Sequence, residues 1–139
     1  MYFIYKSNAI IDEYGFVLFN IEGDEQVFSL RAGISEMVLP TFFSDLTAML
    51  KGEIHSFEVD GNEAMTHYQF KRNGSKLRIE TKHWHIREVY EFSLHNFCKS
   101  LQLAFKKFFR EQRIKGEAEA TEEVLVEWRK FDKAISFSQ

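Results

Sequence analysis

The sequence has little cysteine, proline and glycine, and it has no long apolar run. Cys98 is the only cysteine among 139 residues, so no internal disulfide can form, and we expect a reducing, cytoplasmic location. A single proline and the lack of a serine- or glycine-rich linker predict one domain over residues 1–139. No stretch approaches the roughly 18 apolar residues of a membrane span, and the first residues lack the pattern of a signal peptide.

Motifs of common enzyme classes are also lacking. The chain contains no nucleophile elbow of the G-x-S-x-G type and no glycine-rich phosphate loop. Cys98 falls on the apolar stripe of a predicted helix, which favours a packed core thiol over a nucleophile. We therefore expect a protein that is not an enzyme and that carries no cofactor.

Apolar and aromatic residues are plentiful. Hydrophobic residues make up 45% of the chain, and 15 phenylalanines are among them, so the chain can build a substantial core. Strands are predicted at 2–5, 14–22, 27–32 and 54–60, where aromatic and β-branched residues are bounded by turn formers. Residues 22–26 are expected to form the turn of a hairpin.

Helical spacing of apolar residues appears in three segments. Residues 39–52 place five apolar side chains on one face, with Pro40 in the first turn and Gly52 as the terminal cap. Residues 93–116 and about 121–135 show the same spacing, with Ser93 and Thr121 as N-caps. The order of elements predicts an α+β fold: an antiparallel sheet of about five to seven strands, one inserted helix, and two C-terminal helices packed on the sheet.

A further hairpin is predicted around Asn73-Gly74, a pair that readily adopts the positive φ angles of a two-residue turn. Counting outward from that turn pairs Phe70 with Leu77 and Tyr68 with Ile79. The same register places His67 opposite Glu80, which would give this histidine an ordinary charged partner.

The stretch "KHWHI" (82–86) follows, and it interrupts the alternation of buried and exposed positions. From Trp84 onward the bulky residues lie on the other parity, so we expect a bulge or turn near Lys82-His83. Trp84 and Ile86 would then point inward and His85 toward solvent. An alternative function follows from the same stretch: a small-molecule or metal-binding β-fold in which His83 and His85 bind a metal ion, with His67, His95 or Glu80 as the third ligand.

Charge is strongly segregated along the chain. Residues 1–65 carry a net charge of -8, residues 66–115 carry +8, and residues 116–139 carry -3. The acidic half predicts a docking surface for a basic partner, because opposite charge steers association. Its candidate binding residues are the following: Glu22, Asp24, Glu25, Glu36, Asp45, Glu53, Glu58, Asp60 and Glu63.

The basic block supports a third function, nucleic-acid binding through residues 71–115. Against it, most of the helical cations lie in the last turns of a helix, where cations are favoured anyway. Exposed aromatic residues for base stacking cannot be picked out of the pattern.

The order of "FFSDLTAMLKGE", "FEVDGNEAMTHYQFKRNGSKLRIET" and "FSLHNFCKSLQLAFKKFF" resembles small bacterial immunity proteins of the wall-associated, WapI-like type. The resemblance covers most of residues 20–110 and lies in the order of elements and in hydrophobic spacing. It implies a cytoplasmic antitoxin that blocks a cognate toxin domain, with the acidic surface covering a basic cleft. The C-terminal helix after Gly116 departs from that pattern.

Overall fold

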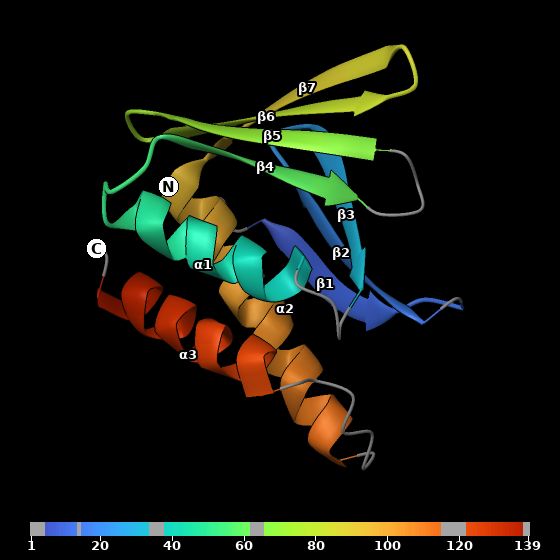
Figure 1. Cartoon of the computed structure of the whole chain (residues 1–139), viewed down its shortest axis with the longest axis vertical. Helices are drawn as coiled ribbons and strands as arrows, with labels where there is room; N and C mark the ends of the chain where they lie inside the picture. The colour runs from blue at the N-terminus through green and yellow to red at the C-terminus, as the bar shows by residue number, and fades with distance from the viewer. Residues whose placement is uncertain (1–4, 14, 34–37, 62–65, 115–121, 138–139) are drawn as a thin grey trace.

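A computed structural model describes residues 5–13, 15–33, 38–61, 66–114 and 122–137. Seven strands and three helices follow one another in these ranges (Figure 1). The strands are β1 (Lys6–Ile11), β2 (Phe16–Gly23), β3 (Gln26–Gly33), β4 (Ser56–Gly61), β5 (Thr66–Asn73), β6 (Lys76–His83) and β7 (Ile86–Ser93). The helices are α1 (Val38–Leu50), α2 (Leu94–Ile114) and α3 (Glu122–Phe137). The predicted α+β class is therefore confirmed.

The strands form two antiparallel sheets instead of the single sheet that the sequence predicted. One sheet has the order β1-β2-β3, and the other has the order β4-β5-β6-β7. The predicted strand at 2–5 lies mostly outside the described residues, and β1, which follows it, was not predicted. The polar start of β1, "KSN", conceals the alternation that continues into Ala9 and Ile11.

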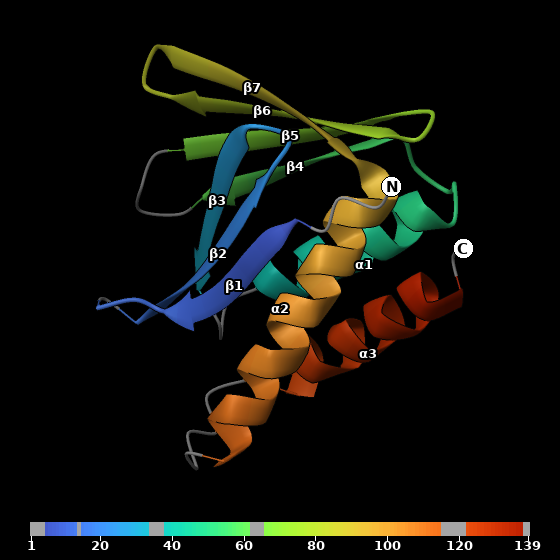
Figure 2. The same cartoon turned by 180° about the vertical axis from the view of Figure 1, so that it is seen from behind.

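α1 and α2 pack against the sheets, and α3 forms an outer layer on the helices. α2 runs past β1 and lies behind α1 in Figure 1 and in front of it in Figure 2, with the four-stranded sheet above both helices in each view. α3 packs mainly against α1, with a smaller contact to α2. The prediction that both C-terminal helices pack on the sheet is therefore right for α2 and wrong for α3. The apolar stripe of α3 instead buries Val124, Trp128 and Phe131 among helices.

Every one of the ten elements contributes side chains to one continuous core. Phe28 on β3 lies between the two sheets, with ring contacts to Tyr68 and Phe70 on β5 and to Tyr90 on β7. Phe97 on α2 extends the same cluster. Aromatic pairs of this kind stabilise by about 0.5–1.5 kcal/mol beyond the area that they bury. Contacts among aromatic rings, most of them phenylalanines, therefore pack the two sheets against each other and against α2.

The β5–β6 hairpin exists, but its register differs from the predicted one by two residues. Phe70 pairs with Ile79, and Asn73 pairs with Lys76, so Gly74 and Ser75 form the two-residue turn. Gly74 alone has a positive φ, of 64°, which is the requirement at the first position of a type II′ turn. Because the shift is even, every residue keeps its predicted face; His67, however, lies opposite Lys82 and not Glu80.

The predicted turn at "KHWHI" is confirmed, and His85 faces solvent as predicted, but the predicted inward direction of Trp84 and Ile86 is wrong. β6 ends at His83, β7 begins at Ile86, and Trp84 and His85 form the turn between them. Trp84 and Ile86 are exposed instead of inward. Ile86 shares a sheet face with the buried Phe92, but it is the first residue of β7, and the buried part of this strand lies at its other end.

Polar contacts close the ends of the helices. After α1, the N–H groups of Gly52 and Glu53 donate to Met49 and Ala48, and Gly52 has a φ of 77°, as a C-terminal cap requires. Arg72 on the core side of β5 donates to the Met49 carbonyl over 2.7 Å and ties the sheet to this helix end. The Ser93 hydroxyl accepts from the N–H of Asn96 and caps α2 as predicted.

Candidate functional site

Two of the nine predicted acidic residues, Glu58 and Asp60, line a groove beside α1. Three others, Glu22, Asp24 and Glu25, lie at the β2–β3 turn in the other sheet. Glu53 follows the C-terminal end of α1, and Asp45 is half-buried on that helix, where burial raises the pKa of its carboxyl group. Glu36 and Glu63 lie outside the described residues. The predicted residues therefore do not form one surface.

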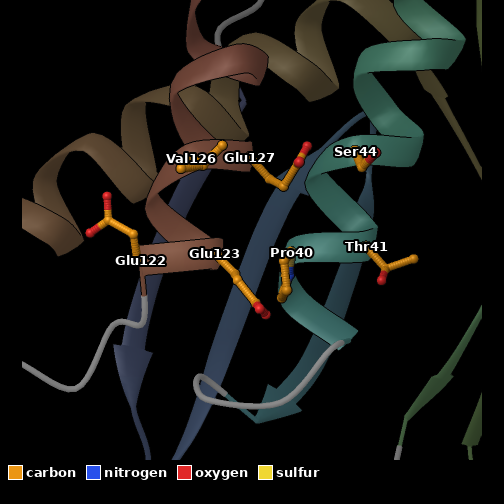
Figure 3. Close-up of a pocket in the computed structure, with 7 residues that line it drawn as sticks. All are labelled: Pro40, Thr41, Ser44, Glu122, Glu123, Val126 and Glu127. Atoms are coloured by element: carbon orange, nitrogen blue, oxygen red, sulfur yellow. The ribbon is translucent and has the colours of Figure 1, made fainter.

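A second groove lies between α1 and α3, with a volume of about 410 Å³. Pro40, Thr41 and Ser44 line one side, and Glu122, Glu123, Val126 and Glu127 line the other. Figure 3 shows the Glu123 and Glu127 side chains extending into the gap toward α1, whereas Glu122 points away. Among the residues that the structure describes, the lining contains three carboxylates and no basic side chain.

The groove between α1 and β4 has a volume of about 230 Å³ and is lined by Val38, Thr41, Phe42, Glu58, Val59 and Asp60. Thr41 lines both grooves, so the two open on either side of the first turns of α1. The period of α1 explains this arrangement. Its buried residues, Phe42, Phe43 and Leu46 among them, hold the helix in the core, and Thr41 and Ser44 fall on the opposite, exposed side.

We call these two grooves the α1 acidic surface, and its five carboxylates are Glu58, Asp60, Glu122, Glu123 and Glu127. Few cations oppose them. Lys130 lies 3.4 Å from Glu127, and His67 Nδ1 lies 2.7 Å from Asp60 and Nε2 3.6 Å from Glu58. Within the described residues, Glu122 and Glu123 form no ion pair. The hydrogen bond with Asp60 is the main cause that raises the pKa of His67, with Glu58 adding to it.

The α3 carboxylates of this surface are functional candidates that the sequence did not single out. Glu122 and Glu123 lie in the first turn of α3, where negative charge is favoured. Because this explains their presence, the sequence offered no reason to predict them as binding residues. Glu123 and Glu127 share a helix face at the i, i+4 spacing, and like charges at that spacing are slightly unfavourable. This repetition is the one local signal in the sequence. The packing of α3 on α1, which completes the groove, leaves no such signal.

The histidines of the metal hypothesis do not converge. His83 ends β6 on the core side of the sheet, with its Nδ1 2.9 Å from the Thr66 hydroxyl. His67 lies on the outer face of β5, and His85 lies in the exposed turn. In the part of the chain that the structure describes, no group of three or more histidine, cysteine, aspartate or glutamate side chains could hold a metal ion.

The cations of residues 71–115 divide between two surfaces that the core separates. Lys71, Arg78, Lys82 and Arg87 lie on the outer face of the four-stranded sheet. Lys99, Lys106, Lys107 and Arg110 lie on the exposed side of α2, which packs against the inner sides of the sheets. Arg72 points inward and caps α1. The cations that the structure describes in this block therefore form no single basic face.

Cys98 is fully buried on α2, and burial raises the pKa of its thiol well above the ordinary value. A thiol that stays protonated is a poor nucleophile, so its contribution is packing, as predicted from its place on the apolar stripe.

Comparisons with models of protein families, with curated proteins and with solved structures found no match to this chain. Among the described residues, none of the helices has the length and apolar character needed to cross a membrane.

Proposed function

We propose that this protein is a non-enzymatic binding module that docks a basic partner on the α1 acidic surface. The observation that supports the proposal is the pair of grooves flanking one helix, whose described lining residues include five carboxylates and no lysine or arginine. The same grooves are also lined by apolar side chains, among them Val38, Pro40 and Val126. An arginine or lysine side chain could therefore pack its aliphatic stem on these residues and place its charged group near the carboxylates.

The proposed partner is a cognate toxin domain with a basic cleft, and the proposed role is that of an immunity protein in the cytoplasm. The resemblance of the sequence to WapI-like immunity proteins motivates this choice. An inhibitor must bind quickly, and complementary charge raises the association rate by orders of magnitude over that of neutral partners. The metal and nucleic-acid alternatives have less support, since the histidines lie on different sides of the sheet and the cations on different sides of the molecule.

Co-expression with the product of the adjacent upstream gene tests the proposal. We expect a complex that copurifies at low salt and weakens as salt is raised, because exposed charges are screened over about 8 Å at physiological ionic strength. A variant that combines Glu58→Lys with Glu123→Lys should lower the affinity at least tenfold.

The matched control combines Glu13→Lys with Glu111→Lys, which makes the same change in net charge at two exposed residues outside both grooves. Thermal unfolding of both variants verifies that they are folded. The proposal fails if the neighbouring gene encodes no toxin-like C-terminus, or if the control weakens binding as much as the groove variant does.

A further inference from the structure

β7 is an edge strand, and half of its free edge is covered by side chains from elsewhere. His83 and Ile86 flank a two-residue turn, so they form a hydrogen-bonded pair, and alternate residues from Arg87 onward direct their N–H and C=O groups away from β6. The backbone N–H of Glu91 donates to Oε1 of Gln26 over 2.8 Å, and the backbone carbonyl of Glu91 accepts from Nε2 of Gln26 over 2.6 Å. The N–H of Ser93 donates to the Tyr5 hydroxyl over 3.0 Å.

The other half of the edge is open. In the described residues, the outward N–H and C=O groups of Arg87 and Val89 have no partner within the protein. Three large apolar side chains surround them, and their exposed fractions are 63% for Trp84, 56% for Ile86 and 49% for Val89. Edge strands usually carry a proline, a bulge, a cover or charged side chains that prevent further pairing. Within the described ranges, the outer half of β7 has no proline, bulge or cover, and its charged side chains, Arg87 and Glu88, oppose pairing with like charge but not with a segment of complementary charge.

The turn beside this edge is costly to form. Trp84 has a φ of 59°, a left-handed conformation that glycine adopts freely and that costs a bulky residue about 1–3 kcal/mol. The indole does not recover this cost by packing, because most of it is exposed. An exposed aromatic ring at a strained turn is the kind of side chain that binding surfaces concentrate.

We propose that the edge of β7 at Arg87–Val89 binds an extended peptide segment of another protein, which pairs as a fifth strand. Backbone hydrogen bonds to Arg87 and Val89 would supply affinity, and Ile86 and Val89, which lie on opposite faces of the sheet, would contact side chains of the segment on those two faces, with Trp84 beside them at the turn. This surface lies at the opposite edge of the sheet from Glu58 and Asp60, so the inference does not depend on the proposed function.

A second copy of the chain is a poor occupant, because each symmetric register meets an obstacle. Two antiparallel β7 strands centred on Arg87 place two guanidinium groups opposite each other. Centred on Glu88, they place two carboxylates opposite each other, and like charges in directly opposed positions are destabilising. Centred on Val89, they require the backbone of Glu91, which Gln26 already occupies.

The charges on the outer face indicate the chemistry of the segment. Arg87 lies directly opposite Lys82, and the carboxylate that Arg87 contacts is Glu80, at 2.8 Å on the neighbouring rung. An acidic side chain next to Arg87 would therefore extend this rung favourably. An antiparallel segment would place apolar residues beside Val89 and Ile86, which gives the order apolar, any residue, acidic, apolar.

The probe is a synthetic amidated hexapeptide with the order threonine, valine, lysine, aspartate, isoleucine, threonine, added to the ¹⁵N-labelled protein. We expect the amide signals of Arg87 and Val89 to shift and their hydrogen exchange to slow. Replacing the aspartate with lysine, or methylating the backbone nitrogens of the valine and the aspartate, should each weaken binding at least tenfold.

Val89→Pro provides the matching change in the protein. It removes an N–H that points away from β6, so the β6–β7 ladder remains, and proline is tolerated at such edge positions. We expect at least tenfold weaker binding. Val27→Pro is the control, because Val27 is also an exposed valine, on β3, an edge strand of the other sheet.

Three results would each overturn the inference. One is that neither peptide protects the two amides, and another is that the lysine peptide binds as well as the aspartate peptide. The third is a concentration-dependent dimer, measured by sedimentation, that protects the same amides without peptide, since a second copy would then be the occupant.

Discussion

The β2–β3 and β6–β7 hairpins both have a two-residue turn, but one is held against the rest of the protein and the other is not. Each has a two-residue turn that places non-glycine residues at positive φ: Asp24 and Glu25 at 52° and 63° in the first, and Trp84 at 59° in the second. The first hairpin is anchored. The Tyr5 hydroxyl donates to Asp24, Gln26 bonds to the backbone of Glu91, and Phe28 packs between the sheets. The end of the second, with its exposed Trp84 and Ile86, extends past the core.

The difference shows that turn chemistry makes a hairpin but does not decide what the hairpin is for. Side chains outside the turn decide it. Gln26 on β3 covers part of the free edge of β7, and Phe28 on the same strand packs in the core between the sheets. In the β6–β7 hairpin, the outward backbone groups of Arg87 and Val89 are left open. The variants below are chosen to remove an anchor from the first hairpin or to change the free end of the second.

Removal of the Phe28 ring should have the largest effect. Phe28 is buried between the sheets, so Phe28→Ala should lower the free energy of unfolding by about 3–5 kcal/mol. Ile86→Ala, at the free end of the other hairpin, should cost less than about 1 kcal/mol, since Ile86 is mostly exposed. Urea unfolding measures both. Equal losses would contradict the comparison.

The next largest loss of stability is expected when a side chain is added at Gly23, beneath the Tyr5 ring. A Cβ atom on Gly23 would lie 2.0 Å from Cδ1 of Tyr5, so Gly23→Ala must displace the tyrosine ring. We expect a loss of about 1–3 kcal/mol, which is the usual cost of overpacking. In a Tyr5→Ala background the same substitution should cost much less. A double-mutant cycle with no coupling energy would show that the two residues do not touch in solution.

Gln26→Ala should cost about 1 kcal/mol, because each of its two hydrogen bonds to Glu91 contributes modestly at an exposed site. Hydrogen exchange at the Glu91 amide should become faster, while exchange at the Val89 amide should not change. Gln69→Ala, on the outer face of β5, is the control and should leave Glu91 protected. Unchanged protection of Glu91 in Gln26→Ala would mean that the edge is covered by something else.

The same comparison explains how far the sequence could predict the fold. The helical period was enough to locate α1, α2 and α3, whereas the predicted cap Thr121 lies outside the described residues. Turn formers located the β2–β3 and β5–β6 hairpins, the second with a register that differs by two residues, and the change of parity located the β6–β7 turn. The division into two sheets was not predictable, because it depends on Phe28 entering the space between them. Alternation assigned Ile86 to the same face as Phe92, but it could not tell how far along β7 the core extends.

The candidate site shows the same limit. Glu58 and Asp60 could be chosen from the sequence, because they alternate with buried residues on one strand. Glu123 and Glu127 could not, because their groove exists only where α3 meets α1, two helices that most of the chain separates (Figure 3). Glu22, Asp24 and Glu25 were chosen for their charge. Sequence proximity to other acidic residues could not show that a different sheet holds them.

The smallest expected effect concerns the turns themselves, and it should differ in sign between the hairpins. Trp84→Gly relieves a left-handed conformation and removes no buried contact, so we expect unfolding free energy to rise by as much as about 1 kcal/mol. Asp24→Gly relieves the same conformation but loses the hydrogen bond from Tyr5, so it should not stabilise the protein. Thermal unfolding of the two variants measures the difference. If Trp84→Gly lowers stability, the indole is packed in solution, and the free end of the β6–β7 hairpin is anchored after all.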